Sequence, residues 1–379
     1  MRAATLLMCA VSLPWSDYAV AGRGKWAFAA LVARAARTGG DVHPVLTFVV
    51  AALLLIPAAA VLARAGDAIA THTGIGRVWI GAVLIAGATS LPELATDISA
   101  VRLGVADLAA GDLFGSSMAN MLILAVIDQL SRNLVLRRAA LDNTLAAGLA
   151  ISVTALAAMF VLVRPTHGLW GIAPESIILV AIYIGGTRAV YRHAGRQAPG
   201  ADAIAADVVV DGPAPVAQAA IPTLRRAIAQ FVVAAVVILA SAPFLAGAAK
   251  DLADLSGLGA TFIGTLMVGL VTSLPELVTC LVAVRMGAFD LAVGNLFGSN
   301  AFNMGIFFAM DLAAPGPIFA SLDPDHVVSA LGGILLMSIG LAAIIYRAEK
   351  RIAFIEPDSL LMLVVYVGVV WLLYLHVTP

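Results

Sequence analysis

Long apolar stretches, separated by short polar ones, dominate the sequence from about residue 44 onward. A helix needs about 20 apolar residues to cross the roughly 30 Å hydrocarbon core of a bilayer. Lipid offers the backbone no hydrogen-bond partners, so we expect each such stretch to be an α-helix. Ten stretches qualify, and the pattern therefore predicts an all-α polytopic membrane protein. They lie at 44–64, which Pro57 is expected to interrupt, and at 75–101, 107–130, 140–163, 170–190, 226–248, 257–285, 290–313, 327–346 and 358–376.

A polar stretch divides the chain into two regions, and the first 43 residues form a separate segment. Residues 191–225 carry several Arg, Pro and Gly residues, which predicts a flexible linker between two five-helix regions, 44–190 and 226–379. The first 43 residues hold Arg2, a short apolar run and the small residues Ala19-Val20-Ala21, a weak signal-peptide pattern. An over-extended start of the coding sequence explains this segment equally well. Both explanations stay open, and we exclude the segment from the fold.

Composition agrees with a membrane location. Hydrophobic residues make up 61% of the chain and charged residues 12%, and the mean hydropathy is +1.01. This charge fraction is about half that of a soluble domain. A formal net charge of -1 argues against a nucleic-acid partner. Cys9 and Cys280 give neither a disulfide framework nor a metal cluster, and no obligatory protein partner is evident.

The distribution of Lys and Arg predicts the orientation, because these residues concentrate in cytoplasmic loops. One set of loops holds only Arg102, Arg164 and Lys250. The opposite set, expected to be cytoplasmic together with the linker, holds Arg64, Arg77, Arg132, Arg137, Arg138, Arg188, Arg192, Arg196, Arg225, Arg226, Arg285, Arg347, Lys350 and Arg351. We expect both termini outside, in a bacterial inner (plasma) membrane, although the basic N-terminal segment argues against this.

An internal repeat runs through both regions at a constant offset of 183 residues. Thr89-Ser90-Leu91-Pro92-Glu93-Leu94 aligns with Thr272-Ser273-Leu274-Pro275-Glu276-Leu277, and the match continues without a gap to Asp128 and Asp311. The two copies begin five spans apart, an odd number, so the second copy enters the membrane in the opposite sense. The chain is therefore predicted to contain two inverted five-helix repeats with a shared site near the midplane, as in many secondary transporters.

Glu93 and Glu276 carry the chemistry of the repeat. A charged group at the centre of a bilayer costs about 2.5–3.5 kcal/mol on insertion scales, and such residues usually have a function. A buried structural glutamate is the alternative for one residue alone, but two in equivalent settings favour a shared site. Pro92 and Pro275 lack an N–H, so each frees a carbonyl one turn earlier as an oxygen ligand.

Further oxygen ligands lie on the helix that follows each glutamate. Ser116 and Asn120 are four residues apart and share one helix face, as do Ser299 and Asn303, while Gly115 and Gly298 permit close packing. Calcium takes six to eight hard oxygen ligands in a flexible cage. No histidine or cysteine cluster suits zinc or copper. Simple packing of helices by polar residues is the alternative for each side chain taken singly.

These motifs resemble the two alpha-repeats of the calcium/cation antiporter superfamily, which includes sodium/calcium and calcium/proton exchangers. The first repeat reads Gly87-Ala88-Thr89-Ser90-Leu91-Pro92-Glu93 and Gly115-Ser116-Ser117-Met118-Ala119-Asn120. The second reads Val271-Thr272-Ser273-Leu274-Pro275-Glu276 and Gly298-Ser299-Asn300-Ala301-Phe302-Asn303. The resemblance implies antiport of Ca²⁺ or a similar cation against H⁺ or Na⁺, with spans one and six sliding across the core.

The resemblance also implies a role for each motif residue. Glu93 and Glu276 would be the central carboxylate ligands, and Thr89 and Thr272 would supply backbone carbonyls. The exchanged cation would be bound by four serines, and two asparagines would complete the ring: Ser90, Ser116, Ser273, Ser299, Asn120 and Asn303. The transported ions are then Ca²⁺ and Na⁺ or H⁺, and no cofactor is expected.

The coupling ion depends on further polar residues. Asn303 stands where sodium/calcium exchangers commonly carry an aspartate, which favours coupling to protons. Two ionised glutamates give a charge of about −2, which one divalent ion or two protons would neutralise. Asp97 and Asp112 are accessory candidates, and Asp112 could supply the charge that Asn303 lacks and restore sodium coupling. Alternatively, both aspartates lie toward the aqueous ends of their helices.

Two other functions are alternatives to antiport. Paired glutamates could line a passive cation channel, but inverted repeats with proline-broken helices favour alternating access. Gly111-Asp112 has a faint similarity to the Gly-Asp pair of intramembrane aspartyl proteases. Such catalysis needs two apposed aspartates, and the equivalent second position is Asn295. We therefore do not expect an enzyme.

Overall fold

The computed structural model describes residues 44–73, 87, 89–131, 135–139, 143–168, 172–197, 222–285, 287–346 and 356–377. Helices joined by short turns make up nearly all of these residues. The N-terminal segment 1–43 and linker residues 198–221 lie outside the described residues, as do Ala88 and most of the predicted span before it.

Ten helices longer than ten residues correspond to the ten predicted spans within the described ranges. They are α4 (Pro44–Thr73), α6 (Leu91–Arg102), α7 (Ala106–Leu130), α9 (Asn143–Val163), α10 (Pro174–Gln197), α12 (Leu224–Ser256), α15 (Leu274–Arg285), α16 (Phe289–Ala313), α18 (His326–Tyr346) and α19 (Pro357–Val377). Shorter elements are α8 (Val135–Arg138), α13 (Gly259–Ile263), the π-helix η2 (Gly264–Val268), α14 (Gly269–Thr272) and α17 (Ile318–Ser321).

Seven stretches among the described residues are long and apolar enough to cross a membrane, namely Pro44–Gly66, Ala106–Leu130, Asn143–Val163, Leu224–Ser256, Gly259–Arg285, His326–Tyr346 and Pro357–Leu375. Helix α16 is not among them, since it carries several amides, nor is α10. The predicted count of ten spans therefore stays a prediction. The expected interruption at Pro57 is wrong, because α4 runs through it. One proline removes one backbone hydrogen bond, and neighbouring helices compensate in membrane proteins.

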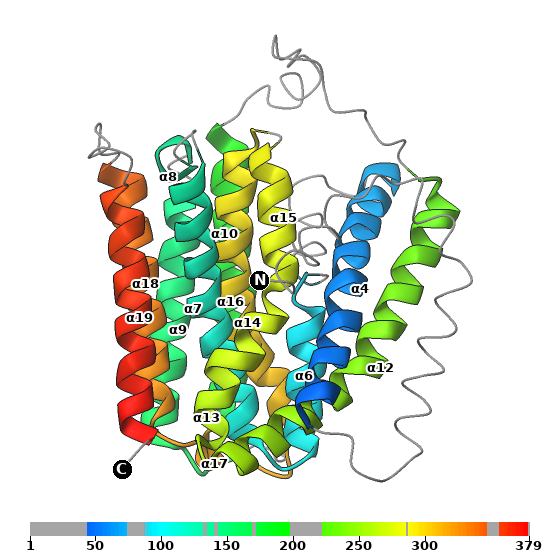
Figure 1. The fold of residues 1–379 in the computed structure, drawn as a ribbon. Coiled ribbons are helices and arrows are strands. Elements are labelled where there is room, and N and C mark those ends of the chain that lie inside the picture. Colours follow the sequence, from blue (N-terminus) through cyan, green and yellow to red (C-terminus); the bar gives the residue numbers. More distant parts are fainter. Residues whose placement is uncertain are drawn as a thin grey trace.

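The two repeats point in opposite directions (Figure 1). Helices α6 and α15, which carry the two glutamate motifs, lie in the lower and upper halves of the molecule. The short helices α8 and α17 begin at equivalent positions, 135 and 318, and lie at the top and bottom. The inverted-repeat arrangement predicted from the sequence is therefore present in the fold.

Equivalent hydrogen bonds connect each repeat to the other at both ends of the bundle. The Ser359 hydroxyl donates to Asp128, and the Ser176 hydroxyl donates to Asp311 at 2.7 Å. Asp128 corresponds to Asp311, and Ser176 corresponds to Ser359, at the repeat offset of 183. Exchanging the two halves therefore reproduces the contact, as expected for pseudo-two-fold symmetry. These bonds fix the starts of α19 and α10 to the partner repeat.

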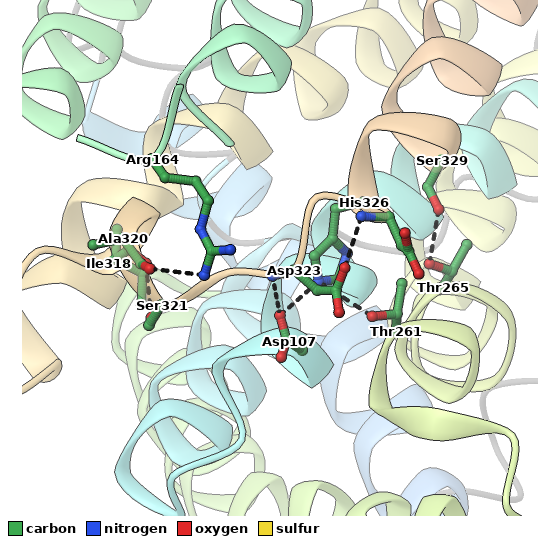
Figure 2. Close-up of polar contacts among 11 residues, drawn as sticks. Asp107, Arg164, Thr261, Thr265, Ile318, Ala320, Ser321, Asp323, His326 and Ser329 are labelled. Atoms are coloured by element: carbon green, nitrogen blue, oxygen red, sulfur yellow. Dashed lines mark hydrogen bonds and ion pairs between the residues drawn. The ribbon is translucent and has the colours of Figure 1, made fainter. Parts of the chain in front are cut away.

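A second pair of contacts follows the same symmetry. Nε2 of buried His326 lies 3.1 Å from Oδ1 of Asp107, which also accepts the backbone N–H of Asp323 at 2.8 Å (Figure 2). The equivalent contact is made by Nδ2 of Asn143, which donates to Asp290 at 3.3 Å. The starts of α7 and α16 are thus held by the fourth helix of the opposite repeat.

Helix α7 packs tightly against the broken span that contains the π-helix. A Cβ atom on Gly115 would lie 2.5 Å from Cα of Thr265 and closer still to its carbonyl oxygen. On Gly269 it would lie 2.7 Å from the Gly115 carbonyl carbon. Small residues let membrane helices approach this closely. The contact brings Thr272, at the end of α14, onto the polar face of α7.

Helices α4 and α12 form a long pair at one side of the bundle (Figure 1). A separate apolar cluster joins them to α6, and it consists mainly of alanine: Ala58, Ala59, Leu62, Ala95, Ala234, Ile238 and Ala242. One large core joins the other helices and also includes residues of α4, α6 and α12. The pair contacts α6, α14 and α15, which hold the two glutamate motifs.

Candidate cation site

Both glutamates lie in the first turn of a helix that begins at the motif. Helix α6 starts at Leu91 after Ser90, and α15 starts at Leu274 after Ser273. Proline at the second position of each helix fits there, because a first-turn N–H has no intrahelical partner. Glu93 and Glu276 therefore sit beside the positive end of a helix dipole, which stabilises negative charge. In the second repeat Ser273 separates α14 from α15, and in the first repeat α6 begins directly after Ser90.

All twelve candidate residues are buried inside the bundle. Each has an exposed fraction of 0%: Thr89, Ser90, Glu93, Asp97, Asp112, Ser116, Asn120, Thr272, Ser273, Glu276, Ser299 and Asn303. The alternative that Asp97 and Asp112 lie toward the aqueous ends stays a prediction, because burial within the protein does not fix depth in the membrane. Helix α7 passes through the bundle interior, so Asp112 is covered like most residues of that helix.

The two glutamates lie within electrostatic range of each other and of Asp112. Oε1 of Glu276 accepts the Ser299 hydroxyl at 3.2 Å, and the hydroxyls of Ser299 and Ser90 are 3.0 Å apart. The Thr89 side chain is a further hydrogen-bond neighbour of Glu276. A continuous polar path thus joins the motif of the first repeat to the glutamate of the second.

A second polar group joins the repeats in the opposite direction. The hydroxyls of Ser116 and Thr272 are 3.1 Å apart, and they lie 3.1 Å and 2.8 Å from Oδ1 of Asp112. The Ser116 hydroxyl is also 3.3 Å from the Gly269 carbonyl. Thr272 therefore contributes its hydroxyl to this group, whereas the sequence suggested its carbonyl. A carbonyl role for Thr89 and Thr272 stays a prediction.

The amides lie on the contact between α7 and α16. Asn120 donates to the side-chain oxygen of Asn300 at 2.8 Å, and Asn300 donates to the backbone carbonyl of Ser117 at 3.3 Å. Sequence reasoning left Asn300 out of the candidate ligands. Its position directly after Ser299 in the repeat, opposite its counterpart Ser117, could have identified it.

Several buried polar atoms in this region have no hydrogen-bond partner. They are both carboxylate oxygens of Glu93, Oε2 of Glu276, the Ser273 hydroxyl, Oδ1 of Asn120 and the side-chain amide of Asn303. Unpaired buried polar atoms are rare in folded proteins and call for an explanation. In the described parts of the chain, no Lys or Arg is buried to balance the carboxylates. Such a group of oxygens is suited to a hard cation.

The ligand atoms of the candidate site indicate which kind of ion it suits. The described residues contain no group of three or more His, Cys, Asp or Glu side chains arranged around one metal position. Zinc and copper prefer histidine and cysteine ligands. Two carboxylates with hydroxyl and amide oxygens are instead suited to a hard ion that binds and leaves.

The chain is similar in sequence to known membrane proteins. A family profile described as sodium/calcium exchanger protein matches residues 43–191 and again residues 226–375. CaxA of Alkalimonas amylolytica, assigned as an antiporter, is 28% identical over 331 residues, covering 85% of this chain and 96% of CaxA. The inner membrane protein YrbG of Escherichia coli K12 is 27% identical, over 80% of this chain and 89% of YrbG.

Solved structures share the fold. The Ca²⁺/H⁺ antiporter protein YfkE aligns with a TM-score of 0.61 at 16% identity, covering 92% of this chain and 97% of YfkE. The H⁺/Ca²⁺ exchanger CAX aligns with a TM-score of 0.59 at 13% identity, over 94% and 92% of the two chains. The sodium-calcium exchanger NCX_Mj aligns at 0.52 and 19% identity, over 87% and 98%.

Proposed function

This chain belongs to the sodium/calcium exchanger family, a family of transporters, and on that premise we propose that it exchanges Ca²⁺ for H⁺ or Na⁺ by alternating access. The observation that carries the proposal is that Glu93 and Glu276, from inverted repeats, lie within electrostatic range of each other among buried polar atoms without partners. Relatives are described as Ca²⁺/H⁺ antiporters and as sodium/calcium exchangers. No enzymatic step and no cofactor form part of the proposal.

Charge balance explains why the bound ions would alternate. Two ionised glutamates leave a charge of about −2 in a low-dielectric interior, where unpaired charge is unfavourable. One Ca²⁺, two protons or two Na⁺ would neutralise it equally well. The empty, fully charged site is therefore disfavoured, and the site changes sides only when it is loaded. Coupled exchange follows from this restriction.

The paired helices α4 and α12 are proposed to control access to the site. They contact both glutamate helices, and a cluster of mainly small side chains joins them to α6. A surface of alanines has few protruding groups, so the pair can shift along it without breaking an interlocked packing arrangement. Access would then open to one side of the membrane at a time.

Transport in proteoliposomes tests the proposed function. The wild-type chain is expected to take up Ca²⁺ when an outward H⁺ or Na⁺ gradient is imposed, and Glu93→Gln or Glu276→Gln is expected to reduce uptake by about 100-fold or more, since either change removes a charged ligand. Normal uptake by both variants would refute the site. A passive channel would show flux without counterflow, whereas an exchanger accelerates uptake when unlabelled Ca²⁺ is present on the opposite side.

The membrane and the orientation are also proposals. A relative is named as an inner membrane protein, and we propose the same location, with both termini outside and the linker in the cytoplasm. Reporter fusions at residue 379 and within residues 198–221 would report opposite sides if this orientation is correct. A cytoplasmic C-terminus would reverse it without changing the site.

A further inference from the structure

Asp97 and Asp112 form a second acidic pair that the central site leaves unexplained. Asp97 lies one turn after Glu93 on α6, and Asp112 lies one turn before Ser116 on α7. Both are fully buried, and their carboxyl groups lie within electrostatic range of each other. Two carboxylates in contact repel each other unless a positive charge lies between them.

The polar atoms of this pair are only partly satisfied. Oδ1 of Asp112 accepts the Thr272 hydroxyl at 2.8 Å and the Ser116 hydroxyl at 3.1 Å. Oδ2 of Asp112 and both oxygens of Asp97 have no hydrogen-bond partner, nor does the buried hydroxyl of Thr96. Three carboxylate oxygens and one hydroxyl therefore lack a hydrogen-bond partner.

The second repeat provides an internal comparison. The counterparts of Thr96, Asp97 and Asp112 are Thr279, Cys280 and Asn295. Asn295 donates to the Thr279 hydroxyl at 3.1 Å, and that hydroxyl donates to the Glu276 carbonyl at 3.0 Å. Cys280 is buried and uncharged. The same location is thus internally satisfied in one repeat and left with unpaired anionic oxygens in the other.

The charge of the whole region exceeds what one calcium ion balances. Glu93, Glu276, Asp97 and Asp112 are all buried, and the described residues bury no Lys or Arg beside them. A Ca²⁺ ion between the glutamates leaves the two aspartates uncompensated. A buried carboxylate without a compensating charge destabilises the folded protein. A second position for positive charge, one helical turn from the first, would balance the two aspartates when they are ionised.

We propose that Asp97 and Asp112 bind a second hard cation, of the Na⁺ class, beside the central position and together with the Thr96 hydroxyl. A monovalent ion fits better than a second Ca²⁺, because repulsion from the central dication scales with charge. The site has no equivalent in the second repeat. This inference rests on the proposed function, since it adds to the Ca²⁺ position a monovalent cation that is bound at the same time.

Equilibrium binding of radiolabelled Na⁺ to the purified full-length protein tests this site at fixed pH and saturating Ca²⁺. The wild type is expected to retain a Na⁺ ion that Ca²⁺ does not displace, and Asp97→Asn or Asp112→Asn is expected to weaken that binding by about tenfold or more. Cys280→Ser, at the position equivalent to Asp97, is the matched control and should retain it. Radiolabelled Ca²⁺ binding in the same samples reports whether each variant is folded.

Each other outcome overturns the second site. Equal Na⁺ binding by wild type and Asp97→Asn, or no Na⁺ bound alongside Ca²⁺, would show that the pair does not hold this cation. If the aspartate variants fail to fold, Thr96→Val removes one oxygen without a change of charge, and unchanged Na⁺ affinity in that variant would refute the site. Absence of Ca²⁺ binding and Ca²⁺ flux in the wild type would instead refute the proposed function.

Discussion

Gly115 and Gly298 occupy equivalent positions in the two repeats but have different surroundings. A Cβ atom on Gly115 would press into the backbone at Thr265, whereas one on Gly298 would have nothing within 4 Å. The sequence suggested close packing for both glycines, and only Gly115 confirms it. The difference arises because α7 contacts the π-helix, while α16 makes no such contact at Gly298.

This difference predicts unequal responses to the same substitution. Gly115→Ala is expected to lower the midpoint of thermal unfolding in detergent, because overpacking a rigid backbone contact costs about 1–3 kcal/mol. Gly298→Ala is the matched control and should leave the midpoint within a degree or two, about the effect of a few tenths of a kcal/mol. Equal destabilisation by both variants would contradict the packing described for α7.

Residue identities also limited what could be predicted about the site. The glutamates, serines and asparagines were identifiable because they recur at a fixed offset. Asp97 and Asp112 break the repeat, so symmetry gave no indication that they are buried. The hydroxyl contact between Thr272 and Asp112 joins residues 160 apart, and no local pattern encodes it.

At the scale of elements, the pairing of α4 with α12 is the feature most relevant to transport. Their shared cluster is built largely from alanine, and Ala59 and Ala242 have no exposed surface. Helix ends were predicted within a few residues for most spans, since the apolar stretches end sharply. The breaks in the seventh span were predicted only at the proline, because a π-helix follows from tertiary contacts and has no sequence signature.

A bulky residue in the alanine cluster is expected to impair movement more than binding. Ala242→Phe should lower the maximal rate of Ca²⁺ uptake by about tenfold, equivalent to about 1.4 kcal/mol, with a smaller change in KM. Val236→Phe, on the same helix at a position 58% exposed, is the control and should transport normally. Uptake kinetics in proteoliposomes distinguish the two, and equal rates for both variants would contradict the proposed role of the pair.

At the scale of the whole molecule, the repeats hold each other at both ends. Two equivalent hydrogen bonds link the halves, one between Ser359 and Asp128 and one between Ser176 and Asp311. Asp107 and Asp290 each contact a side chain of the opposite repeat. The duplication was predictable from the offset, but the partners were not, because each bond joins positions more than 130 residues apart. The result is a fixed frame around the two glutamates.

The most direct test of the central claim is to locate a bound heavy cation in the purified protein. Crystals or frozen particles prepared with Sr²⁺ as a calcium substitute should show one strong peak in contact with the carboxylates of both Glu93 and Glu276. A peak that touches only one of the two glutamates, or none at this position under conditions that support transport, would contradict a shared cation site between the inverted repeats.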